Sequence, residues 1–266
     1  MASLEARGVE LSWSERGAGP AVLLVHETAT SSAAWAGVAE QIAAQGGRAI
    51  SYDRRGWGSS GVPDGYVRTT IEEQSEDAAA LLEGIGVGRA VLCGAGIGAV
   101  IALDLQLRHP ALADAAVLIE PPALALLPEA TELLSADRRA LEVAAGEGRD
   151  SLVRLYLSGG LGALAAGVER LPAEVTAPAR ERPASVVAEI GAAPAWAMPV
   201  TRLREAEPPP ALLVSASTPA LLRAAATALA ARYGDEPLEL GGDAPPHLGD
   251  PAGVARIALA SSSARR

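Results

Sequence analysis

The chain has few of several residue types, and each shortage excludes a class of protein. Its 266 residues include one Cys, which rules out an internal disulfide framework and a metal site of several cysteines. The longest uncharged apolar run, Ala90 to Leu103, contains three Gly and is too short to span a bilayer core of about 30 Å. Basic residues number 22 against 32 acidic ones, which argues against nucleic acid and against an anionic membrane surface as partners.

Hydrophobic residues are plentiful. They make up 49% of the chain, so a sizeable core can form and disorder is not expected. The length fits one to two domains of about 150 residues. The amino terminus lacks the apolar stretch behind a basic start that a secretory signal needs. We therefore expect a soluble, cytoplasmic protein.

Strand and helix signals alternate along the first 120 residues. An alternating apolar and polar segment predicts a half-exposed antiparallel strand, and the solid apolar runs after it predict strands buried on both faces. The predicted strands cover residues 9–13, 20–26, 48–52, 89–93 and 114–119, and the predicted helices cover 33–45, 70–85 and 97–109. This rhythm indicates a parallel sheet with helices on both faces.

Capping residues mark two of these helix starts. Thr70 to Glu73 form a capping box, and Ser32 is placed to cap the helix that begins at Ala33.

The rhythm stops between residues 121 and 207, where Ala- and Pro-rich helical stretches contain no strong strand. It then resumes with strands at 211–215 and 237–240, a helix capped by Thr218 and a last helix from Asp250, before a tail at 261–266 that is expected to fray. We predict a core domain of residues 1–120 and 208–266, interrupted by a helical cap of residues 121–207.

Four segments carry a resemblance to a known family. They are Val25-His26-Glu27, DRRGWGSS at 53–60, GAGIG at 94–98 and GDAPPHLGDP at 242–251. In this order they resemble the His-Gly strand end, the D-x-R-G-x-G-x-S loop, the G-x-S-x-G nucleophile elbow and the catalytic-His loop of α/β-hydrolases. The resemblance covers about residues 8–120 and 208–262. It implies an α/β-hydrolase fold, with a mostly parallel eight-stranded sheet, helices on both faces and a helical cap insertion.

The family's catalytic triad does not carry over to this chain. Gly96 stands at the nucleophile position, and Gly has no side chain that could attack a substrate. The acid after the seventh strand would fall at Ser217 or Thr218, and Asp243 takes the place of the catalytic His. If the last loop holds one extra residue, His247 is the displaced base instead.

Acids follow three of the predicted strands, namely Glu27, Glu120 and Asp243. Open α/β sheets bind ligands at the carboxyl ends of their strands. Carboxyl groups gathered under a cap raise the pKa of at least one of them, so that a general acid and a general base can coexist. Each candidate also has a structural alternative: a turn cap for Glu120, a pair with Arg54 or Arg55 for Glu27, an Asx-turn for Asp243 and a surface position for His247.

The residues expected to contact a substrate are His26, Gly96, Ile97, Tyr156 and Trp196. The backbone N–H groups of Glu27 and Ile97 could donate to a substrate oxygen, in the room left by the glycine at the elbow. The aromatic side chains of Tyr156 and Trp196 are candidates for lining an apolar pocket, with plain core packing as the alternative. For His26, the alternative to a substrate contact is a hydrogen bond within its own loop.

We therefore expect an enzyme of the α/β-hydrolase fold that acts without a serine nucleophile on a small to medium apolar substrate with an ester, lactone or epoxide oxygen. Glu27, Glu120, Asp243 and His247 would supply acid–base catalysis of a hydrolysis, an epoxide opening or a lyase or cyclase step. The alternative is a catalytically inactive protein of this fold that binds or senses a ligand. No metal and no organic cofactor is implied, the expected partner is a small apolar molecule, and a homodimer stays open.

Overall fold

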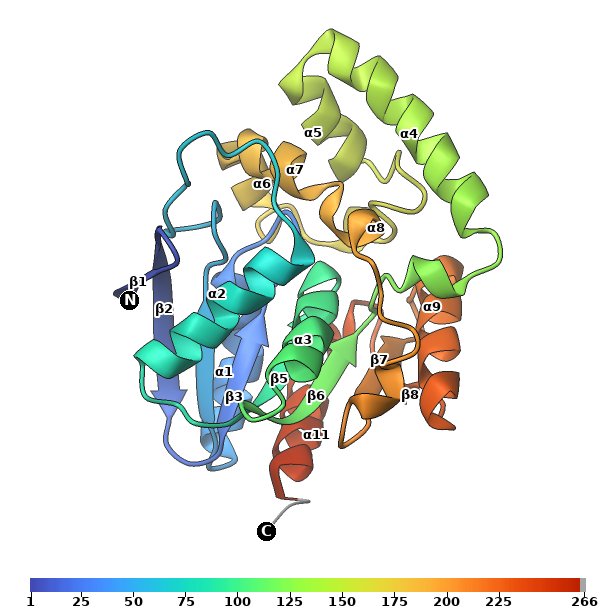
Figure 1. Ribbon diagram of the computed structural model, residues 1–266. Coiled ribbons are helices and arrows are strands. Elements are labelled where there is room, and N and C mark those ends of the chain that lie inside the picture. The colour runs from blue at the N-terminus through green and yellow to red at the C-terminus, as the bar shows by residue number, and fades with distance from the viewer. Residues whose placement is uncertain (264–266) are drawn as a thin grey trace.

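The computed structural model describes residues 1–263 and contains one eight-stranded sheet (Figure 1). The strands are β1 (Ala2–Ala6), β2 (Val9–Gly17), β3 (Ala21–Val25), β4 (Arg48–Tyr52), β5 (Ala90–Ala95), β6 (Ala113–Ile119), β7 (Ala211–Ser215) and β8 (Leu238–Leu240). Their order in the sheet is β1-β2-β4-β3-β5-β6-β7-β8. β2 pairs antiparallel with β1 and β4, and all other neighbours pair in parallel. The predicted mostly parallel, eight-stranded α/β fold is confirmed.

The solid apolar runs of the sequence form the centre of the sheet. The flanking helices are α1 (Ala36–Ala44), α2 (Ile71–Gly84), α3 (Ile97–Arg108), α9 (Ala220–Ala230), α10 (Pro246–Gly249) and α11 (Pro251–Ser263). All residues of β3 are buried, because successive side chains point to opposite faces and helices cover both. Leu23 and Val25 share a cluster with residues of α2 and α3, whereas Val22 and Leu24 share one with residues of α1 and α11.

Between β6 and β7 the chain leaves the sheet and forms a group of helices, which we call the insertion. Its helices are α4 (Ala130–Glu147), α5 (Arg149–Leu157), α6 (Ala177–Glu181), α7 (Pro183–Glu189) and α8 (Ala192–Ala195). Figure 1 shows them together over one end of the sheet. Tyr156, Leu161 and Val186 of the insertion share a buried apolar cluster with Ala29 and Trp57, so the insertion packs on loops of the sheet.

The helices vary in how much of their surface is buried. The longest, α4, has 18 residues, and only Asp137 and Ala144 of these are buried. Among residues 1–263, no helix combines the length and the apolar character that a membrane crossing needs.

Helix boundaries agree with the sequence signals in one case and differ in two. Thr70 caps α2 as predicted, its side-chain oxygen accepting the N–H of Glu73 at 3.1 Å. Ser32 does not cap α1, because a 3₁₀ turn comes first and the Ser32 N–H donates to Oδ1 of Asp53 at 2.8 Å. α11 continues to Ser263, so the tail predicted from residue 261 is helical at its start, and residues 264–266 lie outside the described part of the chain.

Candidate active site

The turn from β5 into α3 depends on glycine. Gly96 has a φ of +53°, in the left-handed region that residues with a Cβ rarely adopt. A Cβ on Gly98 would clash with the carbonyl oxygens of Val25 and His26, and one on Gly94 would clash with the backbone of Gly98. The start of α3 therefore lies directly against the carboxyl end of β3, which brings the turn beside the residue that follows β3.

That residue, Glu27, fills the space beside Gly96. A Cβ built on Gly96 would lie 3.0 Å from the Cβ of Glu27 and 3.3 Å from its Oε2. The carboxyl group thus stands close to the point where the side chain of a larger residue at this turn would begin. A Cβ at this position would require the Glu27 side chain to shift by a few tenths of an ångström.

His247 approaches the same carboxyl group from the other end of the chain. It lies on α10, is 2% exposed, and its ring centroid is 4.9 Å from that of Trp35. Its Nε2 is 3.5 Å from Oε1 of Glu27. Burial, and then the charge of Arg170, lower the pKa of His247 to about 3. Burial, and then the charge of Glu120, raise the pKa of Glu27 to about 8. At neutral pH the pair is an uncharged imidazole beside a protonated carboxyl.

Glu120 has different partners. Its Oε2 accepts a hydrogen bond from Nη2 of Arg170 at 2.5 Å, and its Oε1 accepts one from Oγ1 of Thr218 at 2.6 Å. Arg170 also donates to Oγ of Ser217 at 3.1 Å. The prediction that Thr218 caps the following helix is wrong, because Pro219 stands at the cap of α9 and the Thr218 hydroxyl binds Glu120. Ser217 and Thr218, the two positions considered for the triad acid, therefore both contact the Glu120–Arg170 ion pair, which joins the sheet to the insertion.

These groups face a cavity between the sheet and the insertion, partly open to solvent. Six of the predicted site residues line it: Glu27, Gly96, Ile97, Glu120, Tyr156 and His247. Large apolar side chains supply much of the remaining wall: Ile119, Leu124, Leu164, Val168, Ile190 and Leu222. Two of the three acids predicted at strand ends therefore meet in one cavity.

Two predicted site residues lie elsewhere, which corrects their expected roles. Asp243 is exposed at the surface, because the loop turns into α10 and directs His247 inward instead. Trp196 packs in the core beside α3, where its Nε1 donates to Oδ1 of Asp104 at 3.0 Å. The core alternative therefore applies to Trp196, and Tyr156 is the aromatic of the two that lines the cavity.

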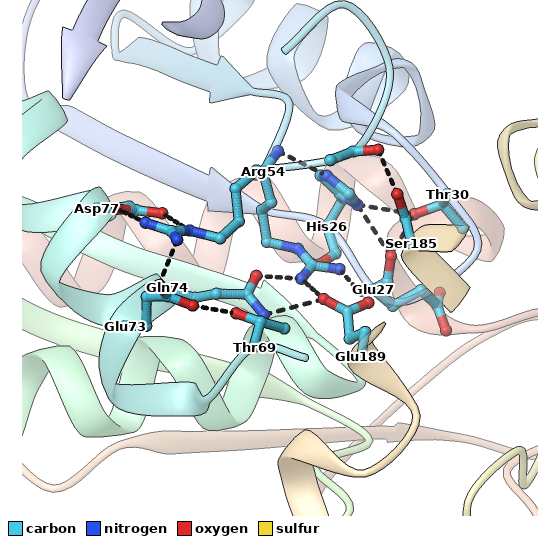
Figure 2. A network of polar contacts seen from close by, with 12 residues as sticks. His26, Glu27, Thr30, Arg54, Thr69, Glu73, Gln74, Asp77, Ser185 and Glu189 are labelled. Atoms are coloured by element: carbon cyan, nitrogen blue, oxygen red, sulfur yellow. Dashed lines mark hydrogen bonds and ion pairs between the residues drawn. The ribbon is translucent and has the colours of Figure 1, made fainter. Parts of the chain in front are cut away.

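His26 lies beside the cavity in a buried polar network (Figure 2). Its Nδ1–H donates to the carbonyl oxygen of Glu27 at 2.9 Å, and its Nε2 accepts the backbone N–H of Arg54 at 3.0 Å. Burial, and then the charge of Arg54, hold the pKa of His26 well below its usual value. Both ring nitrogens of His26 form hydrogen bonds within the protein. These bonds replace the substrate contact that was predicted for His26.

The arginines weighed as partners of Glu27 bind other acids. The guanidinium of Arg54 forms a bidentate ion pair with Glu189, the last residue of α7, and Nε of Arg55 binds Oδ2 of Asp77 at 2.5 Å. Within the described chain, neither arginine forms an ion pair with Glu27.

Glu189 and Arg170 line the cavity but were missed in the sequence. They lie in an Ala- and Pro-rich segment without a recognisable motif, and they gain their partners only when the insertion packs on the sheet. The charge of each residue was the only signal that the sequence offered.

The cavity offers acids but no metal-binding set. Across residues 1–263, no three His, Cys, Asp or Glu side chains gather as a bound metal ion requires. Arginine, threonine and histidine side chains contact the cavity acids instead.

Comparison with known sequences identifies relatives of most of the chain. The model of the alpha/beta hydrolase family matches residues 22–257. An uncharacterized hydrolase of Bacillus subtilis (strain 168), YraK, is 34% identical over 125 residues, which are 47% of this chain and 46% of that protein. An epoxide hydrolase of Caballeronia sordidicola is 36% identical over 107 residues, which are 40% of this chain and 32% of that protein. The chain thus spans less than half the length of these curated relatives.

Comparison with solved structures shows the same fold over the full chain. A thermophilic esterase from Thermogutta terrifontis superposes with a TM-score of 0.69 over 96% of this chain and 95% of its own, at 22% identity. At this identity the likeness concerns the fold alone.

Proposed function

Since the chain belongs to the alpha/beta hydrolase family, we propose that it hydrolyses a C–O bond without a serine nucleophile. The observation that carries this proposal is the contact of Glu27 with His247, 3.5 Å apart beside Gly96 in the cavity. A protonated carboxyl is an acid and an uncharged imidazole is a base. The pair therefore places a proton donor, Glu27, beside a proton acceptor, His247, in the cavity.

In the proposed reaction, Nε2 of His247 takes a proton from a water molecule while the water oxygen bonds to the electrophilic carbon. The bond from that carbon to the leaving oxygen breaks, and the leaving oxygen takes the proton of the Glu27 carboxyl. The imidazolium and the carboxylate then lie 3.5 Å apart, and transfer of the proton between them restores the starting state. An epoxide would give a diol by this route, an ester would give an acid and an alcohol, and a lactone would give a hydroxy acid.

Backbone donors are proposed to hold the reacting oxygen. Ile97 is the first residue of the 12-residue helix α3, so its N–H has no acceptor within the helix and lies at the positive end of the helix dipole. The N–H of Glu27 is the second proposed donor. Removing one donor of this kind typically lowers kcat about 10²- to 10³-fold.

The charges around the cavity favour an uncharged substrate. In residues 1–263, the cavity pairs Glu120–Arg170 and Arg54–Glu189 each cancel, and the acid–base pair is neutral at neutral pH. A carboxylate or an ammonium group on the substrate would lose its water without gaining a free counter-ion, at a cost of several kcal/mol. The relative named as an epoxide hydrolase supports an uncharged, oxygen-bearing substrate.

A single-turnover experiment in H₂¹⁸O tests direct attack by water. The protein in excess is mixed separately with styrene oxide, phenyl acetate and γ-butyrolactone. We expect ¹⁸O in the product of the first turnover, no ¹⁸O in the Glu27 carboxyl and no labelling by a serine-directed phosphonate. Incorporation of ¹⁸O into Glu27 would mean a covalent ester at this residue, and labelling by the phosphonate would mean a serine nucleophile.

The Glu27→Gln variant is the matched control, because it keeps the size of the side chain and removes the acidic proton. The alternative function, ligand binding without reaction, predicts a different outcome. None of the three compounds would then be turned over, while an uncharged apolar compound would still raise the Tm of the protein.

A further inference from the structure

One arginine connects the insertion to the loop that follows β3 (Figure 2). Both carboxylate oxygens of Glu189 bind the guanidinium of Arg54, with Nη2 at 3.0 Å from Oε2. Nε of the same arginine donates to the carbonyl oxygen of His26 at 2.9 Å, and its backbone N–H donates to Nε2 of His26 at 3.0 Å. Arg54 therefore binds the insertion with one end of its side chain and fixes His26 with the rest of the residue.

His26 in turn fixes the backbone of Glu27. Its Nδ1–H donates to the carbonyl oxygen of Glu27 at 2.9 Å, and that oxygen also accepts a hydrogen bond from Oγ1 of Thr30 at 2.9 Å. The loop is a tight turn in which Ala29 has a φ of +72°, a conformation that surrounding contacts must hold. These two hydrogen bonds hold the backbone of the residue that carries the cavity carboxyl group.

The ion pair between Arg54 and Glu189 is deeply buried. The side chains of Arg54 and Glu189 are 1% and 0% exposed, and Nε2 of Gln74 donates to Oε1 of Glu189 at 3.0 Å. A buried ion pair gains little net stability over apolar residues of similar size, because both charges lose their water. Its fixed geometry between the insertion and the β3 loop therefore points to a role in positioning.

We propose that Glu189 is a positioning residue, which holds the Glu27 carboxyl beside Gly96 through Arg54 and His26. This inference rests on the proposed function of Glu27 as an acid. It adds that the acid is in place only while the insertion is docked on the sheet. Docking of the insertion over a substrate and placement of the proton donor would then be one event.

Hydrogen exchange of the full chain, followed by mass spectrometry, tests the proposal without a substrate. Glu189→Gln removes the counter-charge of Arg54, and we expect the amides of residues 26–30 to exchange at least tenfold faster. Ser185→Ala is the matched control, because Ser185 lies on the same helix and its Oγ donates to the carbonyl oxygen of Gly56 at 2.6 Å, independently of Arg54. This control should leave exchange at 26–30 unchanged.

Equal acceleration in both variants, or none in Glu189→Gln, would overturn the proposal. If Glu189→Gln does not fold, the double variant Arg54→Met/Glu189→Met takes its place, since it removes both buried charges together. It still lacks the bond from Nε to His26, so it should also exchange faster at 26–30. Unchanged exchange in the double variant would likewise overturn the proposal.

Activity separates this inference from the proposed function. On the compound that turns over in the ¹⁸O experiment, Glu189→Gln should lower kcat at least tenfold with a smaller change in KM, and Ser185→Ala should keep the wild-type kcat. Full activity of Glu27→Gln would instead refute the proposed function. The exchange result would still decide whether Glu189 positions the loop.

Discussion

Glu27 and Glu120, two of the three glutamates that line the cavity, differ in what surrounds them. Glu27 contacts an uncharged imidazole, and burial raises its pKa to about 8. Glu120 has a guanidinium on one carboxylate oxygen and a hydroxyl on the other, and such partners bind the charged form of a carboxyl group. Both acids follow central parallel strands and line the same cavity, but they have different partners there.

This difference separates the roles that the two acids can take. A group that gives up a proton near neutral pH must hold one there, and Glu27 fits that condition. Glu120 is tied to Arg170 and Thr218, so we propose that its charge acts on the pKa of Glu27 rather than on the substrate. The sequence predicted a catalytic role for both glutamates, because their positions after strands can be read from the sequence. Their contacts with Arg170, Thr218 and His247 cannot.

Glu27→Gln should have the largest effect. The amide keeps the shape of the side chain but has no acidic proton, so kcat should fall about 10³-fold, within the range of about 10² to 10⁴ known for general acids. Steady-state kinetics on the compound chosen by the ¹⁸O experiment measures this loss. Retention of more than a tenth of the wild-type kcat would remove Glu27 from the mechanism.

The stability of Glu27→Gln should depend less on pH than the stability of the wild type. The pKa of Glu27 is raised in the folded state to about 8, so its contribution to stability is full below the unfolded pKa and is lost as pH rises through 8. Gln does not titrate. The Tm of the variant, measured from pH 5 to 9, should therefore fall less than that of the wild type.

The pH dependence of kcat should show which form of Glu27 reacts. The acid must carry its proton, so kcat should fall tenfold per unit above its pKa of about 8. His247, with a pKa of about 3, stays an uncharged base at higher pH, so kcat should be level between about pH 4 and 7. A kcat that rises from pH 7 to 9 would contradict the proposal, because the carboxylate would then be the active form.

Much of the fold could be predicted from local sequence, because burial leaves a local signal. β4 and β7 begin and end at the predicted residues, since a strand covered on both faces is a solid apolar run. β1 was missed because it is an edge strand with exposed residues and no such run. The cap at Ser32 was wrong because the Asp53 side chain, 21 residues away, takes the N–H of Ser32.

The site could be predicted only in part, because its contacts join distant segments. The sequence placed Glu27 and His247 at the expected edge of the sheet, but not their contact across more than 200 residues. Arg170 and Glu189 act through packing of the insertion, which has no motif to mark them. Asp243 was overvalued because the sequence cannot show that its loop turns it to solvent.

Glu120→Gln should have a smaller effect than Glu27→Gln, and of a different kind. Its charge raises the pKa of Glu27, and its loss also leaves the Arg170 cation unopposed, so the pKa of Glu27 should fall. The alkaline decline of kcat should move about one unit below pH 8, which lowers the protonated fraction of Glu27, and with it kcat, about threefold at pH 7.5 and about tenfold well above pH 8.

Thr218→Val is the matched control for Glu120→Gln. It removes the hydrogen bond to Oε1 of Glu120 but keeps the carboxylate and its ion pair with Arg170. The alkaline decline should therefore stay near pH 8 in this variant. If Glu120→Gln instead leaves the decline near pH 8 and lowers kcat by the same large factor at every pH, Glu120 contacts the substrate directly and the two acids do not divide the work as proposed.

Asp243→Asn should have the smallest effect. Asp243 and His247 lie in the same loop, yet the first is exposed and the second is buried in the cavity wall. Exchange of an exposed carboxylate for an amide of the same size should change kcat less than twofold and leave the pH profile unaltered. A loss of tenfold or more would mean that the loop turns Asp243 inward when substrate binds. A further acid would then share the cavity, and the contrast between Glu27 and Glu120 would no longer account for the chemistry.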